Sequence, residues 1–283
     1  MPGIDLHSHS SRSDGTFPPE RVVRLAAERG LSILALTDHD TMAGLPEAFA
    51  TAREVGIELI PGLEFSAEHL GKSVHVLAYW CREDDPAFDA ELARLRDDRE
   101  HRGRRMVEKL NELGFDVSFD RVLEIAAGGP VVRPHVAQAM VEAGAVQTEK
   151  EAFERYISDG MPAHVRKHAV GAAEAVRMIS AAGGVAVLAH PGLWGRRDEP
   201  VPEELIDEMA AAGLAGIEAD HVDHGPEQRA HYRSRARALG IAATGGSDCH
   251  GTRSNPVRLG ASRCEPDDLA ALAAAAGRSI AAS

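Results

Sequence analysis

Short apolar runs that alternate with helical stretches are the feature that most constrains the fold of this chain. Pro18-Pro19-Glu20 begins one such helix and Gly30 ends it, a proline start and a glycine stop. Strands that alternate with helices usually pair in parallel, with the helices outside. The pattern predicts an α/β fold, a distorted (β/α)7 relative of the eight-stranded TIM barrel. The expected strands are residues 4–9, 33–38, 58–65, 74–79, 185–189, 216–219 and 241–245.

The alternation is interrupted between about residues 84 and 164. This interval shows only helical patterns, at residues 88–113, 121–127, 133–143 and 148–157, with glycine- and proline-containing breaks between them. We therefore expect a barrel domain formed by residues 1–83 and 165–283. Residues 84–164 are expected to form an all-helical insertion after the fourth strand, placed as a cap beside the site.

Composition and charge exclude several classes of partner. The 283 residues carry a formal net charge of -13, which disfavours adhesion to nucleic acid or anionic membranes through the overall field. No apolar run approaches the roughly 18 to 20 residues that span a bilayer. The three cysteines lack CxxC spacing, and His7 and His9 lie too near the start for a cleaved signal peptide. We expect a cytoplasmic protein with reduced thiols and no obligate protein partner.

Histidines and carboxylates lie at or near the ends of the predicted strands. His7 and His9 are two apart, so on a strand their rings project from one face, and Asp248 and His250 repeat this arrangement after the last strand. Glu64 ends the third strand in an apolar setting, where an unpaired carboxylate would be costly. Nine candidate ligands are too many for one ion. They are His7, His9, Asp14, His39, Glu64, His75, His190, Asp248 and His250.

These motifs together resemble the polymerase and histidinol phosphatase (PHP) family. The resemblance rests on His7-x-His9 with Asp14, Thr37-Asp38-His39-Asp40, Glu64, His75, His190-Pro191 and Asp248-x-His250. It spans nearly the whole chain apart from the helical insertion. The resemblance implies three divalent ions, with manganese favoured and iron or zinc also suited to the ligands. The implied sets are His7, His9, Glu64 and Asp248; Glu64, His75 and His190; and Asp14, His39 and His250.

Such a cluster would be catalytic rather than structural. Three carboxylates, three divalent ions and one bridging hydroxide leave a net positive charge, which suits a phosphate. A water that bridges two ions has a lowered pKa, so a metal-bridging hydroxide would be the nucleophile. Asp38 and Asp40, which flank His39, are expected to support ligands or cap the backbone rather than bind an ion.

Five further residues are candidates for contact with the substrate. Arg133 and His135 open a helix in the insertion, where family phosphoesterases resemble this chain, and they would bind the phosphate and assist the reaction. Lys167 could reach the same phosphate, although an ordinary surface role is an equal alternative. Trp194 could stack on a base or simply pack. His224, like His221, is a candidate to protonate the leaving group.

The resemblance implies a metal-dependent phosphoesterase that acts on a small phosphorylated substrate. Relatives of this size favour the 3′-phosphate of nucleoside 3′,5′-bisphosphates; the alternatives are 5′-3′ exoribonuclease activity on short RNA and histidinol-phosphate phosphatase activity. Only 4% of residues are aromatic and the chain is acidic, which disfavours an extended RNA track or duplex DNA. The non-enzymatic alternative is a barrel that binds metal for structure or docks a polymerase.

Overall fold

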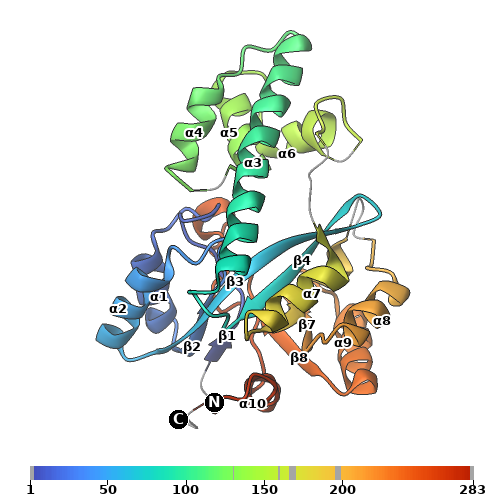
Figure 1. Cartoon of the computed structure of the whole chain (residues 1–283). Helices are drawn as coiled ribbons and strands as arrows, with labels where there is room; N and C mark the ends of the chain where they lie inside the picture. Colours follow the sequence, from blue (N-terminus) through green and yellow to red (C-terminus); the bar gives the residue numbers. More distant parts are fainter. Residues whose placement is uncertain (1–2, 130, 159, 166–169, 195–198, 281–283) are drawn as a thin grey trace.

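The computed structural model describes residues 3–129, 131–158, 160–165, 170–194 and 199–280 (Figure 1). Within these ranges the strands are β1 (Gly3–Asp5), β2 (Leu31–Leu36), β3 (Glu58–His69), β4 (Lys72–Tyr79), β5 (Val170–Gly171), β6 (Val185–Leu188), β7 (Gly216–His221) and β8 (Ala242–Gly246). The α-helices are α1 (Pro19–Glu28), α2 (Leu45–Val55), α3 (Pro86–Glu112), α4 (Phe119–Ala126), α5 (Arg133–Glu142), α6 (Glu149–Ala152), α7 (Ala172–Ala181), α8 (Glu203–Ala211), α9 (Pro226–Leu239) and α10 (Pro266–Ala275). Short π or 3-10 turns are η1 (Phe153–Ile157), η2 (Pro191–Leu193) and η3 (Gly251–Arg253).

The strands form one sheet that curls into a nearly closed barrel. Its order is β1-β2-β3-β4-β6-β7-β8, and the two-residue β5 pairs with β3. The first and last strands meet, because the Leu6 N–H donates to the Gly245 carbonyl at 3.3 Å and Ser8 forms a parallel bridge with Cys249. The predicted α/β barrel is therefore confirmed.

The expectation of parallel pairing throughout is wrong at β4. This strand runs antiparallel to both of its neighbours, β3 and β6. Leu70 and Gly71 alone join β3 to β4, with φ angles of 51° and 77°. A parallel neighbour needs a crossover of about a dozen or more residues, whereas a two-residue turn allows only a hairpin. The predicted strand at 58–65 is accordingly too short, since β3 continues to His69.

The barrel is covered by helices on its outside. In Figure 1, α1 and α2 lie on one side, α7, α8 and α9 on the other, and α10 lies near the two ends of the chain. Each helix buries an apolar face against the sheet: α7 buries Val176 and Ile179, and α1 buries Val22 and Val23. This burial of aliphatic side chains is the main stabilising contribution to the barrel.

The interval after β4 is helical, as predicted. Asp85 begins α3 by accepting the N–H groups of Ala87 and Phe88, and this long helix leads away from the barrel to α4, α5 and α6 (Figure 1). The distal helices bury an apolar cluster of their own, which includes Leu110, Val122 and Met140. The fourth predicted helix continues beyond α6 as the π turn η1. The division into domains at residues 84 and 164 stays a prediction.

Among the described residues, the structure contains no candidate membrane-spanning helix.

Candidate metal centre

Strands that are distant in the sequence end close together at one mouth of the barrel. β1 ends at Asp5, so His7 and His9 lie just beyond it, and the predicted strand at 4–9 is too long. Asp5 is fully buried, and its carboxylate accepts the N–H groups of His7 at 3.2 Å, Ser247 at 2.9 Å and Gly260 at 2.7 Å. This carboxylate therefore fixes the segment that bears the first ligands to the segment that bears the last.

A first group of candidate ligands consists of His7, His9, Glu64 and Asp248. The Nε2 atoms of His7 and His9 lie 3.4 and 3.2 Å from Glu64 Oε2, and 3.3 and 3.1 Å from Asp248 Oδ1. All four ligand atoms lie within 4.8 Å of one another. This group has the composition that the family resemblance implies for the first ion.

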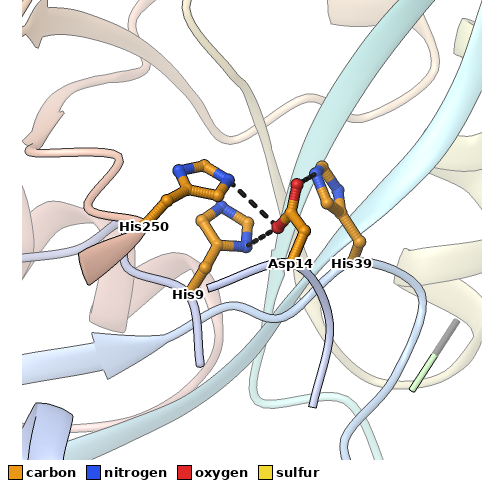
Figure 2. Close-up of side chains that lie close together, drawn as sticks. All are labelled: His9, Asp14, His39 and His250. Carbon is orange, nitrogen blue, oxygen red and sulfur yellow. Dashed lines mark ion pairs between the residues drawn. The ribbon is translucent and has the colours of Figure 1, made fainter. Parts of the chain in front are cut away.

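A second group surrounds Asp14 (Figure 2). Its carboxylate lies 3.1 Å from His250 Nε2 and 3.8 Å from His39 Nε2, and the His9 Nδ1 atom lies 3.8 Å away. Asp14, His39 and His250 are the expected set. His9 joins them because its two ring nitrogens face different groups: Nε2 faces Glu64 and Nδ1 faces Asp14.

Glu64 connects these groups with a third. Its Oε1 atom lies 2.7 Å from His75 Nδ1 and 3.0 Å from His190 Nε2, while Oε2 lies 3.1 Å from His39 Nδ1. A carboxylate with one oxygen toward each group is suited to bridge two ions. All nine predicted ligands thus converge at one mouth of the barrel; the assignment of each to a particular ion stays a prediction.

The electrostatics of the cluster fit divalent cations. Burial alone would raise the pKa of Glu64, but the neighbouring His39 and His75 outweigh it and hold that pKa well below its usual range. For Asp14, burial is likewise outweighed by His250 and His39, and the pKa is lowered. Buried carboxylates that remain ionised need positive charge nearby.

The contacts among these side chains are those of ligand atoms around an ion. Asp14 Oδ1 is buried, with His250 Nε2 at 3.1 Å and His9 Nδ1 at 3.8 Å, and it makes no regular hydrogen bond among the described residues. The Nε2 atoms of His7 and His9 face each other at 3.2 Å, as ligand atoms around a shared ion do. Histidine and carboxylate donors are those that manganese, iron and zinc accept, so the residues fit the metals that the family resemblance implies.

Besides Asp5, two buried carboxylates support the ligands without belonging to the nine. Asp38, predicted from the sequence to be a supporting group, accepts the Ser10 N–H at 2.7 Å and the Ser10 and Ser13 hydroxyls at 2.6 Å. Glu218 contacts His7 and His190, and this role was missed. Burial would raise the pKa of Glu218, but His7, His221 and His190 together outweigh it and the pKa falls to about 2. The sequence did contain a sign of this role, because Glu218 is an acidic residue inside an apolar strand, as Glu64 is.

Two adjoining pockets open beside the ligands toward the helical insertion. One is lined by His75, His190, Trp194 and Arg133, and the other by Asp14, His39 and Arg133 with Lys72 and Arg102. Arg133, at the start of α5, lines both pockets, and its contact with phosphate stays a prediction. Trp194 is buried, and Lys72 Nζ lies 4.3 Å from the centre of its ring.

The other predicted substrate residues are placed differently. His135 is buried, and its Nδ1 accepts the Val132 N–H at 3.4 Å, so the ring caps α5. His224 Nδ1 donates to the Ala219 carbonyl at 2.9 Å, and Nε2 accepts the Gly192 N–H at 3.1 Å. Burial also lowers the pKa of His224. These contacts favour structural roles for both histidines. Lys167 lies outside the described residues.

Comparison with known proteins identifies the family. A model of the PHP domain matches residues 5–158. The chain belongs to the PHP domain family. It is 36% identical to a 3′,5′-nucleoside bisphosphate phosphatase from Chromobacterium violaceum, over 88% of each chain. It is 35% identical to a 5′-3′ exoribonuclease from Haemophilus influenzae, over 87% of this chain and 89% of the other.

The fold is shared with a solved bacterial structure. A Bifidobacterium adolescentis structure named as a metal-dependent phosphoesterase superposes with a TM-score of 0.90 and 34% identity, over 97% of this chain and 96% of the other. The predicted family, barrel and enzyme class, a metal-dependent phosphoesterase, agree with these relatives.

Proposed function

We propose that this PHP protein removes the 3′-phosphate from nucleoside 3′,5′-bisphosphates. The observation that carries the proposal is the convergence of nine ligands beside pockets lined by Arg133. A substrate with two phosphates suits this layout, because one phosphate can lie at the ligands while the other meets the guanidinium. Arginine binds phosphate through two parallel hydrogen bonds, which also fixes its orientation.

The cluster would hold three divalent ions, manganese by preference. When bound, these ions would supply an acidified water and positive charge for the reacting phosphate. The residues of the chain keep the ligands in place: Asp38 holds the loop of Asp14, and Asp5 joins the two ends of the barrel. Lys72 and Arg102 add positive charge to the pocket beside Asp14 and His39. Phe153 and Trp194, which line the other pocket, offer aromatic surface for a base.

Two other substrates would use the same ligands. Short RNA is favoured as a second candidate by the exoribonuclease relative, since its 5′-terminal nucleotide resembles a bisphosphate in carrying phosphate on both sides of one ribose. Histidinol phosphate lacks a second phosphate and leaves Arg133 without a ligand. The bisphosphate is therefore preferred to histidinol phosphate on the charge of the pockets.

The test combines metal analysis with a panel of phosphate esters. Metal-loaded protein should release phosphate from adenosine 3′,5′-bisphosphate faster than it releases phosphate from histidinol phosphate or nucleoside 5′-monophosphate from 5′-phosphorylated short RNA. Asp248→Ala should nearly abolish turnover, because it removes a ligand. Preferential release from histidinol phosphate, or near-normal rates in Asp248→Ala, would overturn the assignment.

A second experiment tests the role of Arg133. A charged hydrogen bond contributes about 1.5–3 kcal/mol, so Arg133→Ala should raise KM for the bisphosphate roughly 10- to 150-fold with little change in kcat. Arg121→Ala is the matched control, because Arg121 lies in the same insertion but pairs with Glu124 and Glu142 at the surface. An unchanged KM in Arg133→Ala would exclude the proposed contact, and a fall in kcat alone would show that Arg133 acts on the reacting phosphate.

A further inference from the structure

Glu218 lies in the middle of β7, where an acidic side chain needs an explanation. Its neighbours in the strand, Ile217 and Ala219, are fully buried, and Glu218 itself is fully buried. A carboxylate removed from water in this way is costly unless hydrogen bonds satisfy both of its oxygens. Its partners therefore indicate why the residue is acidic.

The first oxygen of Glu218 fixes a ring. Oε1 lies 3.0 Å from His7 Nδ1, so the carboxylate requires a hydrogen on that nitrogen. In the neutral ring the Nε2 atom then carries the lone pair. This Nε2 faces Glu64 at 3.4 Å and Asp248 at 3.3 Å, in the first group of ligands. A carboxylate behind a ligating histidine is the usual means of selecting its tautomer.

The second oxygen of Glu218 fixes a stretch of backbone. Oε2 accepts the His190 N–H at 2.8 Å. His190 has φ 28° and ψ 56°, a conformation that residues other than glycine rarely adopt, and it persists only where the surroundings enforce it. The ring on this backbone reaches Glu64 Oε1 at 3.0 Å, in the group that also contains His75.

We propose that Glu218 is a positioning residue that orients ligands of two different ions through one carboxylate. It selects the tautomer of His7 with one oxygen and holds the strained backbone of His190 with the other. The inference rests on the proposed function only for the identity of the cluster as a metal centre. The two donors require two acceptors, and of the residues that match glutamate in size only glutamate provides both.

Replacement of Glu218 by glutamine should disturb either His7 or His190. Its amide has one acceptor and one donor group in the places of the two oxygens. If the amide N–H faces His7, then Nδ1 must accept and Nε2 becomes protonated, which prevents it from binding metal. If the amide N–H instead faces His190, two donors meet and the strained backbone loses its hydrogen bond. Either orientation damages the ligand set of one ion. Alanine leaves space in which water can accept from both donors.

The experiment compares metal binding by Glu218→Gln, Glu218→Ala and wild-type protein. Competition with a chelator should show metal affinity lowered roughly 10- to 100-fold in Glu218→Gln, with at least one ion lost per chain. Glu218→Ala should retain more metal than Glu218→Gln, an order that a purely structural role would reverse. Glu203→Gln, at an exposed position on α8, should match the wild type. None of these measurements uses a substrate, so they stay informative if the bisphosphate proposal fails.

Nitrogen NMR of the zinc-loaded protein provides a second measurement. We expect the hydrogen of His7 on Nδ1 in the wild type, and on Nε2 in any Glu218→Gln molecules that have lost the first ion. Wild-type metal affinity and stoichiometry in Glu218→Gln would overturn the inference, as would a hydrogen on Nε2 in the loaded wild type. If Glu218→Ala fails to fold, comparison of Glu218→Gln with the wild type still decides the matter.

Discussion

Replacement of Asp38 by asparagine should loosen the loop that carries Asp14. The Asp38 carboxylate is buried and receives three hydrogen bonds, from the Ser10 N–H, the Ser10 hydroxyl and the Ser13 hydroxyl. Asparagine can accept on one side only, so its NH₂ group must face one of these donors. If the asparagine oxygen takes the position of Asp38 Oδ1, the asparagine NH₂ group takes the position of Oδ2 and faces Ser10 Oγ. That oxygen already accepts the Arg12 N–H at 3.1 Å.

The size of the effect follows from the loss of one such bond. A hydrogen bond to a charged group contributes about 1.5–3 kcal/mol, so Asp38→Asn should lower the free energy of unfolding of the metal-free protein by about that amount. The same loop places Asp14 opposite His39 and His250, as Figure 2 shows. Loss of a supporting group should also weaken metal binding at Asp14, roughly 10-fold or more.

Urea unfolding of metal-free protein measures the first effect, and chelator competition measures the second. Asp223→Asn is the matched control, because Asp223 is largely exposed and pairs with Arg258, a surface ion pair worth only about 0–1 kcal/mol. An Asp38→Asn protein no less stable than Asp223→Asn, with unchanged metal affinity, would refute the idea that Asp38 holds the loop.

Two further predictions concern packing and pH. Gly246→Ala would place a methyl group 2.4 Å from His7 Cβ, so it should cost about 1–3 kcal/mol and lose metal, whereas Gly171→Ala meets nothing within 4 Å and should change little. Urea midpoints and metal content of the two variants check this. Burial opposes protonation of His9, but hydrogen bonds to Asp248 and Glu64, together with the negative charges of Glu64 and Asp14, outweigh it and raise the pKa of His9 to about 10. The contribution of protonated His9 to the free energy of unfolding is fully present below pH 6.5 and is lost as the pH rises toward 10. Metal-free protein should therefore unfold at a lower urea concentration as the pH rises. A urea midpoint that stays constant or increases with pH would contradict this prediction.

The convergence of the candidate ligands could be predicted from sequence because most of them follow local rules. Carboxyl ends of parallel strands meet at one mouth of a barrel, so histidines and carboxylates at those positions converge even when they are far apart in the chain. His75 reaches the same mouth from near the start of β4, because that strand runs antiparallel to its neighbours. Glu64 stood out as an acidic residue in an apolar run. The direction of β4 was also available: the eight residues between the predicted strands at 58–65 and 74–79 are too few for a parallel crossover.

The partners of Glu218 and the orientation of His135 could not be predicted in the same way. Glu218 and its partner His7 are 211 residues apart, and nothing local to either one indicates that they meet. His135 was expected to bind phosphate from its place at a helix start, yet its ring turns back to cap that helix. For such residues the packing of neighbouring elements, rather than spacing along the chain, decides where the side chain points.

The barrel closes where Ser8, after the first strand, bridges to Cys249, after the last strand, and this junction has a consequence for synthesis of the protein. The candidate metal centre draws groups from both sides of that junction, and the last of them, Asp248 and His250, leave the ribosome long after His7 and His9. A nascent chain therefore holds only part of the ligand set through most of its synthesis. Metal capture is expected to be a late event in biogenesis, and chains released early, before Asp248, should be unable to assemble the site.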